Sequence, residues 1–300
     1  MKRFLVLILA VSLVLMLITP VAFAKSDKDK PLSASDVELV KKVTLKGPKA
    51  PKGKPATQAA SGELGDPCTG TKYAVIVGIS DYPGTSSDLQ YCDDDAEDMY
   101  STLTTIYGYK SANISLLIDA DATFDAIRDA IADIDSVEKV GDEVVFFFSG
   151  HGAKGKANDG DREAMDESIV VHNDNNKQFL YIWDGDLAGW FSGFDSRIIF
   201  IFDSCLAGGM TDLKAPGRVI SMACSETGLS YESDAWGGGH GQFTYYFVEE
   251  GMYYESAEMI NDDTPGVVDV TVEEAFDYAK ANCVSQTPTI SDSFTNDLLP

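Results

Sequence analysis

The chain has 300 residues, of which 48 are Asp or Glu and 23 are Lys or Arg, giving a formal net charge of −25. This acidic balance excludes nucleic acid as the expected partner, because phosphate binding needs a basic face. It suits cationic ligands, metal ions or salty surroundings, and composition alone does not choose among these.

The first 24 residues have the pattern of an export signal. Lys2 and Arg3 precede an apolar run over residues 4–18, and Ala22-Phe23-Ala24 offers small residues at the usual cleavage spacing. The run is short for a membrane span, so we expect a cleaved signal peptide over residues 1–24, no span afterwards, and a secreted or extracytoplasmic protein. The alternative is an uncleaved N-terminal anchor, which leaves the rest of the chain on the same side.

Residues 25–70 form a Lys- and Pro-rich segment that differs from the rest of the chain. Between residues 25 and 54 there are nine Lys and four acids, whereas the chain from Ala56 onward carries a net charge near −32. The segment has only one modest apolar patch, at residues 37–40, and cannot bury a core of its own. We therefore interpret it as a linker or pro-segment that precedes one domain over residues 71–300.

That domain alternates predicted strands and helices. Continuous apolar runs of strand length alternate with amphipathic stretches, and this pattern predicts an α/β fold with a mainly parallel sheet sandwiched between helices. The expected strands are 73–79, 114–118, 144–148, 198–202 and 218–222, the expected helices are 93–106, 123–137, a short one from Asp186, 242–252 and 272–283, and a hairpin-like pair is expected at 169–171 and 179–181.

Two of the predicted strands end in reactive side chains flanked by glycine. Ser149-Gly150-His151-Gly152 follows the strand at 144–148, and Asp203-Ser204-Cys205 follows the strand at 198–202. The carboxyl ends of parallel strands meet at one edge of a sheet, where ligands bind in open α/β folds. His151 and Cys205 are therefore expected to meet there with the spacing that nucleophilic catalysis needs.

The chain holds only three histidines, so each can be weighed. His172 stands beside Asn173 and is expected at the surface. His240 lies in a glycine run, and it is a rival to His151 as catalytic base. No predicted strand fixes His240, and catalytic geometry needs fixing, so His151 is preferred.

Motifs of other α/β enzyme classes are not found at the places where they are expected. There is no Gly-x-Gly-x-x-Gly after the first strand, no phosphate loop ending in Gly-Lys-Ser/Thr, and no Gly-x-Ser-x-Gly elbow. The cysteines are too far apart for Cys-x-x-Cys zinc or redox motifs: Cys68, Cys92, Cys205, Cys224 and Cys283. An oxidising compartment permits up to two disulfides among these five, and Cys205 is expected to be the free thiol.

The chemistry of a Cys-His pair predicts acyl transfer. A thiol with an ordinary pKa of about 8.5 is largely protonated at neutral pH, so an imidazole that accepts its proton is needed. Cys205 would attack a carbonyl and His151 would protonate the leaving amine. The backbone N–H of Gly152 is the candidate donor to the developing oxyanion.

The strand-Ser-Gly-His-Gly and strand-Asp-Ser-Cys pattern resembles the metacaspases and caspase-like cysteine peptidases. The resemblance extends from about Tyr73 to the C-terminus. It implies a caspase-like fold, a His-Cys dyad without a third member, and cysteine-type endopeptidase activity. Two alternatives remain open: a non-catalytic caspase-fold binding module, and a caspase-like transpeptidase that shares the dyad and differs in the acceptor.

Carboxylates near both motifs indicate the specificity. Alternation along an extended segment places Asp203 on the same side as Cys205. The segment Cys92-Asp93-Asp94-Asp95-Ala96 resembles the metacaspase Cys-x-x-Asp-Ala segment, although acids here also suit the positive end of a helix. By that resemblance the substrate pocket is formed by Cys92, Asp95, Ser149 and Asp203. We therefore expect protein or peptide substrates with Lys or Arg before the cleaved bond.

A further set of acids lies in and after the loop that follows the His151 strand. It comprises Asp159, Asp161, Glu163, Asp166, Glu167, Asp184 and Asp186. Carboxylates suit Ca²⁺, but the spacing is not that of an EF-hand, and a solvated acidic loop is the alternative. The resemblance implies Ca²⁺ as a candidate activator, with Asp166, Asp184 and Asp186 as ligands; the dyad chemistry itself needs no cofactor.

The opposite charges of the two parts suggest a zymogen. The Lys-rich segment is covalently attached to an acidic domain, so its local concentration at an acidic pocket can reach the millimolar range. We expect a monomer that cuts itself after one lysine of this segment, the candidates being Lys42, Lys46, Lys49, Lys52 and Lys54. A flexible spacer is the alternative.

Overall fold

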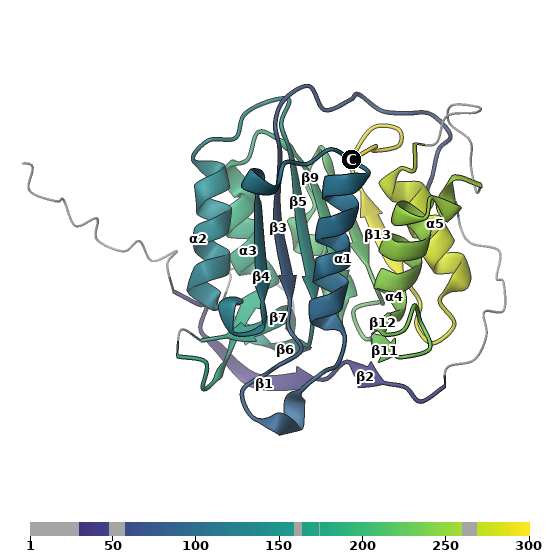
Figure 1. The fold of residues 1–300 in the computed structure, drawn as a ribbon. Helices are drawn as coiled ribbons and strands as arrows, with labels where there is room; N and C mark the ends of the chain where they lie inside the picture. The colour runs from purple at the N-terminus through teal and green to yellow at the C-terminus, as the bar shows by residue number, and fades with distance from the viewer. Residues whose placement is uncertain (1–29, 48–57, 159–163, 174, 260–268) are drawn as a thin grey trace, which may run out of the picture.

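The computed structural model of the protein describes residues 30–47, 58–158, 164–173, 175–259 and 269–300 (Figure 1). Its centre is a six-stranded sheet in the order β13-β10-β9-β5-β3-β4. The five strands from β10 to β4 run parallel, and β13 joins the edge antiparallel to β10. Their bounds are β3 Lys72–Gly78, β4 Ile114–Ile118, β5 Glu143–Ser149, β9 Arg197–Asp203, β10 Arg218–Met222 and β13 Thr289–Asp292.

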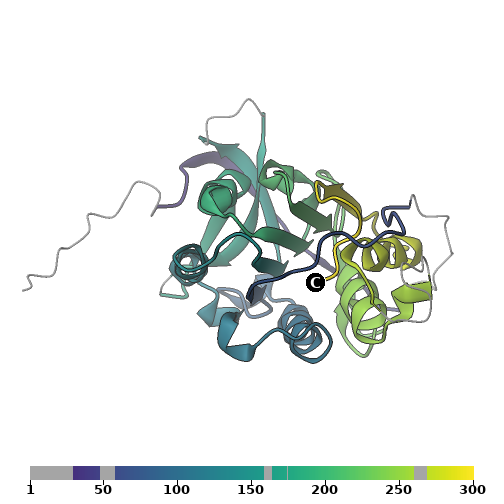
Figure 2. The same ribbon diagram turned by 90° about the horizontal axis from the view of Figure 1, so that it is seen from above.

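Helices cover both faces of this sheet, as Figure 2 shows from above. One face packs against α2 (Phe124–Asp135) and α3 (Asp184–Trp190). The other packs against α1 (Cys92–Thr105), α5 (Val272–Asn282) and the helix that begins as α4 (Gln242–Thr244) and continues in π-helical turns over Tyr245–Tyr253. The predicted α/β fold with a mainly parallel sheet between helices is confirmed.

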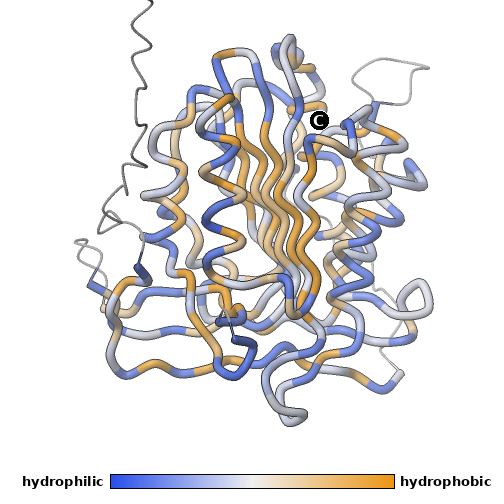
Figure 3. The backbone as a smooth tube through the Cα atoms, turned by 60° about the vertical axis from the view of Figure 1, so that its left-hand side comes forward, coloured by the Kyte–Doolittle hydropathy of each residue, from blue (hydrophilic) through white to orange (hydrophobic). Residues whose placement is uncertain are grey.

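The strands are apolar throughout because alternate residues enter two separate cores. In β5, Phe146 and Phe148 pack toward α2 and α3, whereas Val145 and Phe147 pack toward α1 and α5. All four side chains are fully buried. Figure 3 shows the resulting band of hydrophobic strands through the middle of the molecule. A sheet buried on both faces explains why no polar alternation interrupts these runs.

Two smaller sheets lie at one end of the main sheet, at the bottom of Figure 1. The first has the order β1-β6-β7-β8, with β1 Ala34–Val40, β6 Gly152–Ala157, β7 Asp166–His172 and β8 Phe179–Trp183. Its β7 and β8 are the predicted hairpin-like pair. The second has the order β12-β11-β2, with β2 Val43–Thr44, β11 Tyr231–Ser233 and β12 His240–Gly241.

The Lys-rich segment contributes strands, although it contributes little core. Most residues of β1 are exposed or half-buried, and the strand is held by its antiparallel register with β6, from Ala34↔Ala157 to Val40↔Gly152. Strand β2 then pairs in parallel with β11. A segment without a core of its own can therefore still dock through main-chain hydrogen bonds. The described part of the expected linker is thus attached along its length at residues 34–44.

The structure places His172 differently from the prediction and does not describe the predicted signal peptide. His172 was expected at the surface but is buried; its Nε2 lies 2.9 Å from the Asp81 carbonyl and its ring stacks on Tyr82. The end of β7 is covered by the loop that follows β3, which the local sequence does not reveal. The expected signal peptide lies outside the described residues. Among the described residues no helix combines the length and apolar character of a membrane span.

Candidate active site

The edge formed by the carboxyl ends of β5 and β9 brings His151 and Cys205 together. The parallel register pairs Ser149 with Asp203, and both reactive side chains follow two residues after these ends. Gly152 packs against the Cys205 backbone so closely that an added Cβ would lie 2.1 Å from the Cys205 carbonyl oxygen. Only glycine fits this approach, which explains the Gly after the histidine. It also places the Gly152 backbone beside the thiol-bearing residue.

The His151 ring is held by three contacts, two of which fix its tautomer. Its Nε2 lies 2.8 Å from the Ser87 carbonyl oxygen, which can only accept, so Nε2 carries the proton. Its Nδ1 accepts a hydrogen bond from the Lys42 backbone N–H at 3.0 Å. The ring stacks on Tyr82 with centroids 4.6 Å apart, and the Tyr82 hydroxyl accepts from the backbone N–H of His151. Burial lowers the pKa of His151 to about 4, so the ring is neutral.

The Cys205 thiol is likewise buried in a closed site. Its S–H donates to the Lys41 carbonyl at 3.3 Å, and Sγ accepts from the Ser230 N–H at 3.2 Å. Burial raises the pKa of Cys205 to about 11. The dyad is therefore a neutral thiol and a neutral imidazole, and one peptide group, the C=O of Lys41 and the N–H of Lys42, contacts both of them.

The side chain of Lys42 occupies the pocket beside the dyad. Its ammonium is fully buried, 3.1 Å from Asp203 Oδ1 and 3.5 Å from Asp95 Oδ2. It also donates to Ser149 Oγ at 2.9 Å and approaches Cys92 Sγ at 3.6 Å. The structure thus gathers all four residues expected in the pocket, Cys92, Asp95, Ser149 and Asp203, around one lysine ammonium.

Hydrogen bonds hold the two pocket carboxylates in place. Asp203 Oδ2 accepts from the Thr244 N–H at 3.0 Å and the Thr244 hydroxyl at 2.8 Å, and the Ser230 hydroxyl donates to Oδ1. Asp95 accepts from Ser149 Oγ at 2.6 Å and from the Gly241 N–H. These donors fix both carboxylates before any cation enters the pocket.

Charge complementarity in the pocket outweighs the cost of burial. Burial alone would lower the pKa of Lys42, but Asp203, Cys92 and Asp95 reverse this and raise it well above its usual range. Burial alone would likewise raise the pKa of Asp95, but Lys42 and His240 hold it below its usual value. Lys42 is therefore bound as an ammonium ion, between carboxylates.

The chain leaves the pocket along β11 in a defined direction. The Val43 N–H donates to the Ser230 carbonyl and the Leu45 N–H to the Glu232 carbonyl, so residues 43–45 run parallel to β11. The Thr44 hydroxyl donates to Glu232 Oε1 at 2.6 Å. The peptide group at the dyad therefore precedes Lys42, whereas a peptidase that cuts after lysine acts on the peptide group that follows it.

The expected Ca²⁺ ligands bind backbone N–H groups in the structure. Asp166 Oδ2 accepts from Ala157, Asp184 from Gly185 and Glu167, and Asp186 Oδ2 from Trp183 and Leu32. Burial, together with the nearby charges of Asp212 and Glu167, raises the pKa of Asp184 to about 8. The loop acids at residues 159–163 lie outside the described residues.

Several residues of the site carry no signal in the sequence. Ser230, just before β11, Glu232 in β11 and Gly241 in β12 line the pocket, and these strands are three and two residues long. His240 was expected to lack a fixed position, but it is buried and contacts Asp95. Strands this short leave no periodic pattern in the sequence. The only visible sign of this part of the site was therefore the histidine within the glycine run, His240.

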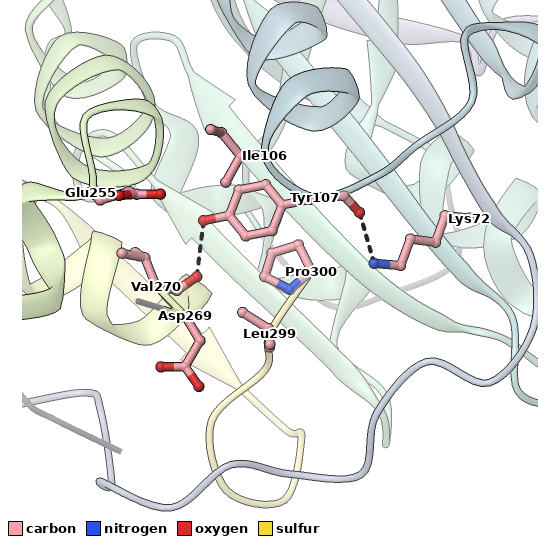
Figure 4. A pocket seen from close by; sticks show the side chains of 8 residues that line it. All are labelled: Lys72, Ile106, Tyr107, Glu255, Asp269, Val270, Leu299 and Pro300. Carbon is pink, nitrogen blue, oxygen red and sulfur yellow. Dashed lines mark hydrogen bonds between the residues drawn. The ribbon is translucent and has the colours of Figure 1, made fainter. Parts of the chain in front are cut away.

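Neither a disulfide nor a surface pocket at the opposite end of the strands contributes to the site. All five cysteines are free, so the disulfides permitted by their number do not occur. A pocket at the amino ends of the strands, lined by Lys72, Ile106, Tyr107, Glu255, Asp269, Val270, Leu299 and Pro300, is shown in Figure 4. Its Lys72 ammonium donates to the Tyr107 carbonyl and the Tyr107 hydroxyl to the Val270 carbonyl, so these groups are used structurally.

Comparison with known proteins agrees with this fold and indicates the family. The family model Peptidase_C14, Caspase domain, matches residues 71–299. Metacaspase-4 of Arabidopsis thaliana is 37% identical over 151 residues, covering 47% of this chain and 35% of that protein. Metacaspase-1 of Kluyveromyces lactis is 32% identical over 158 residues, covering 49% and 35%. The matches thus span about a third of the length of these relatives.

A solved structure supports the same architecture. Protein GSU0716 from Geobacter sulfurreducens superimposes with a TM-score of 0.55 at 17% identity, covering 76% of this chain and 95% of that chain. At this identity the likeness concerns the fold alone. With the family model matching most of the chain, the protein belongs to the caspase-domain family, and it is related to the metacaspases. Members of this family are cysteine-type endopeptidases.

Proposed function

We propose that this protein is a latent cysteine endopeptidase that cuts protein chains after lysine or arginine. The observation that carries the proposal is the Lys42 ammonium, which is buried between Asp95 and Asp203 beside Cys205. A pocket with two buried carboxylates favours a cationic side chain and rejects an acidic one, because an uncompensated buried charge costs several kcal/mol. Lys42, which already lies in the pocket, has the type of side chain that we propose for the substrate.

The geometry supports a two-residue mechanism. The Cys205 thiol proton passes to His151 Nδ1, which carries no proton because the Ser87 carbonyl holds the ring proton on Nε2, and which is free to accept once the Lys42 N–H has left it. The sulfur bonds to the carbonyl carbon of the substrate, with the Gly152 N–H as the proposed donor to the oxyanion. As the C–N bond breaks, His151 Nδ1–H returns the proton to the leaving amine. Water then hydrolyses the thioester by the same proton route.

We also propose that the enzyme is latent, because its own N-terminal segment blocks the site. Residues 41–45 fill the pocket and cover the thiol, so an external substrate must displace them. Held in this direction, the segment presents the bond before Lys42 to the dyad, and Lys42 is an inhibitor in this pose. Of the other expected self-cleavage sites, Lys46 lies just beyond β2, and Lys49, Lys52 and Lys54 lie outside the described residues. We propose that self-cleavage, where it occurs, uses these lysines.

Calcium activation and export remain parts of the proposal that rest on sequence. The carboxylates of Asp166, Asp184 and Asp186 are hard oxygen donors of the type that Ca²⁺ prefers. A bound ion would act on the fold rather than on the dyad chemistry. Thermal unfolding of the Cys205→Ala chain with and without Ca²⁺ tests this: an unchanged Tm in millimolar Ca²⁺ argues against the site.

The test of the activity uses fluorogenic peptides ending in Arg, Lys, norleucine or Asp. We expect the full-length chain carrying Lys42→Ala to cleave the Arg and Lys peptides at least 100-fold faster than the other two. Cys205→Ala in the same background is the matched inactive control. Equal turnover of Arg and norleucine peptides would contradict the specificity, and cleavage by the Cys205→Ala chain would contradict the nucleophile. Transfer of the acyl group to an added amine, in preference to water, would favour the transpeptidase.

A further inference from the structure

The pocket holds more buried negative charge than one lysine can neutralise. Asp95 and Asp203 are both fully buried, and both face the single ammonium of Lys42. Glu232, also buried, lies at the rim, where burial raises its pKa and favours its protonated form. A buried carboxylate without a counter-charge costs several kcal/mol. The two aspartates therefore need a second cation.

His240 is placed to supply it. Lys42 approaches Oδ2 of Asp95, whereas the His240 ring nitrogen Nδ1 lies 3.3 Å from Oδ1 of the same carboxylate. The same nitrogen is 3.5 Å from Asp98 Oδ2, and Nε2 is 3.6 Å from Glu249 Oε2. The ring stacks on Tyr245, and only 7% of the residue is exposed.

The acids that face this ring on the described elements favour its charged form, whereas Tyr245, which stacks on it, is kept neutral because burial and its hydrogen bond to Glu250 raise its pKa. Asp94, Asp95 and Asp98 come from α1, and Glu249 comes from the helix after β12. Burial alone would lower the pKa of His240, but Asp95, Asp98 and Glu249 raise it above its ordinary value. The sign matters: a raised histidine pKa keeps the ring cationic to a higher pH than usual.

We propose that His240 is a positioning residue of the specificity pocket, a buried cation that keeps Asp95 ionised and oriented so that the pocket accepts lysine or arginine. This inference rests on the proposed function and deepens it. Without the imidazolium, Asp95 and Asp203 are neighbouring buried carboxylates in the empty pocket. Asp95 then lacks a neighbour that lowers its pKa, so it takes up a proton more readily as the pH falls, and the pocket loses half of its charge.

The contacts distinguish this role from two others. A catalytic base must touch the reacting peptide group, and that contact belongs to His151, whereas His240 touches Asp95. Asp98, His240 and Glu249 also have ligand atoms within 4.8 Å of one another, a spacing that a metal ion could use. However, the two acids face opposite ring nitrogens. A charged imidazole between acids explains this arrangement better than one bound ion.

The charge of His240 can be measured directly because the chain has only three histidines. The full-length Cys205→Ala chain, ¹³C-labelled at histidine, is titrated by NMR. We expect one ring to titrate above pH 6.5, and His240→Gln to remove that signal. Asp98→Asn should lower its midpoint, whereas Asp133→Asn, on the exposed side of α2, should leave it unchanged. A His240 ring that is already neutral at pH 6 would overturn the proposal.

Kinetics test the consequence for substrate binding, with the full-length Lys42→Ala chain as parent. We expect the parent KM for an Arg peptide to change less than about twofold between pH 7.5 and 5.5. In His240→Gln the KM should rise at least about tenfold over that range, because Asp95 is protonated, while kcat and the KM for a norleucine peptide change little. His240→Lys, which restores a cation, should restore the flat profile.

The contrary outcomes are distinct. A KM for the Arg peptide that is equally flat in the parent and in His240→Gln means that the ring is only structural. A collapse of kcat for every peptide in His240→Gln, with KM unchanged, assigns the base role to His240. A histidine titration that shifts when Zn²⁺ is added at equimolar concentration indicates a metal site instead. A parent chain that does not prefer Arg over norleucine refutes the proposed specificity, and the NMR titration still decides the charge of His240.

Discussion

Cys205 and His151 are unreactive in the closed site because both are buried and uncharged. A pKa of about 11 for the thiol and of about 4 for the imidazole keeps the neutral pair at physiological pH. Water cannot reach the site while the Lys41–Lys42 peptide group covers it. Opening the site therefore changes the reactivity of the thiol as well as access to it, because removing the cover removes the burial that raises the thiol pKa.

Alkylation of Cys205 measures this difference. At pH 8 a thiol of pKa about 11 is about one thousandth thiolate, against roughly a quarter for an ordinary cysteine. We expect iodoacetamide to modify Cys205 at least 100-fold more slowly in the wild-type chain than in Lys42→Ala, with a rate that climbs with pH toward 11. Peptide mass spectrometry follows the site, and the half-buried Cys68 is the internal reference. Equal rates in both chains would show that Lys42 does not close the site.

The pocket carboxylates also act at the scale of single residues. Asp203 accepts from Ser230 and Thr244 as well as facing the lysine ammonium, so its loss affects both recognition and packing. In the Lys42→Ala background, Asp203→Asn should lower kcat/KM for an Arg peptide by about 100-fold or more, because the substrate cation then lacks a buried partner. Asp133→Asn, a remote exposed acid, is the control for simple loss of charge.

Folding must be checked beside these rates. Circular dichroism and Tm of the Asp203→Asn chain separate lost recognition from lost structure. A folded variant that still prefers Arg over norleucine by the wild-type ratio would remove Asp203 from the pocket.

At this scale, the sequence reveals residues that follow long strands and hides residues that follow short ones. His151, Ser149, Asp203 and Cys205 could be predicted because β5 and β9 are continuous apolar runs whose ends can be read. Ser230 could not, because β11 leaves no pattern. The acid cluster in the first turn of α1 was visible as residue types, but which of its members faces the pocket depended on the resemblance and not on the local sequence.

At the scale of elements, β11 and β12, which belong to a separate small sheet, complete the pocket at the carboxyl ends of the main strands. Gly241 in β12 leaves room for the pocket: an added Cβ would lie 2.3 Å from Asp203 Oδ2, 2.7 Å from the Lys42 ammonium and 2.9 Å from Asp95 Oδ2. Each of these is closer than side-chain carbons approach polar atoms. The size of the pocket is thus set by a glycine in a two-residue strand.

Gly241→Ala should therefore fill the pocket. In the Lys42→Ala background we expect the KM for Arg and Lys peptides to rise at least about tenfold, since the methyl group occupies the place of the cation. Gly189→Ala is the matched control, because a Cβ there meets nothing within 4 Å. Gly189 lies in α3, and alanine should stabilise that helix by about 0.5–1 kcal/mol without changing KM. An unchanged KM in a folded Gly241→Ala chain would show that the cation binds elsewhere.

The docking of β1 and β2 shows what the sequence does not reveal about elements. The composition of residues 25–70 predicts that they bury no core of their own. It gives no sign that Ala34–Val40 pairs with the edge of β6, because this pairing uses backbone groups and leaves most side chains exposed. The exposed ion pairs Lys154–Glu38 and Lys156–Asp36 add little to such docking. Main-chain pairing therefore holds the segment in place until its strand is displaced.

At the scale of the whole molecule, the charge asymmetry between the Lys-rich segment and the acidic domain has a structural counterpart at one site. The segment meets the domain where Lys42 enters the pocket, and the tether raises its local concentration there to about the millimolar range. The direction of the chain past the dyad then decides whether the segment is cut or blocks. Because the peptide group at Cys205 and His151 precedes Lys42, the geometry favours blocking.

Lys42→Ala and Lys41→Ala separate these effects in the full-length protein. We expect Lys42→Ala to raise the initial rate on an Arg peptide at least tenfold over wild type, because the pocket is no longer occupied. Lys41→Ala should change the rate little, since the Lys41 side chain points to the exposed Ser86 carbonyl and its backbone still covers the thiol. Equal activation by both substitutions would mean that general loosening of the segment, and not the pocketed ammonium, releases the enzyme.

Intact mass after incubation decides what becomes of the segment itself. In the wild-type chain, with or without Ca²⁺, we expect no cut between Lys42 and Val43 as long as Lys42 stays in the pocket, because the dyad contacts the preceding peptide group instead. A self-cleaved product should end at Lys46, Lys49, Lys52 or Lys54, and should be missing from the Cys205→Ala chain. A product ending at Lys42, formed at a rate independent of protein concentration, would mean that the segment turns round within the same molecule and is a substrate. If its rate rises with concentration, one chain cuts another after the segment has left its own pocket.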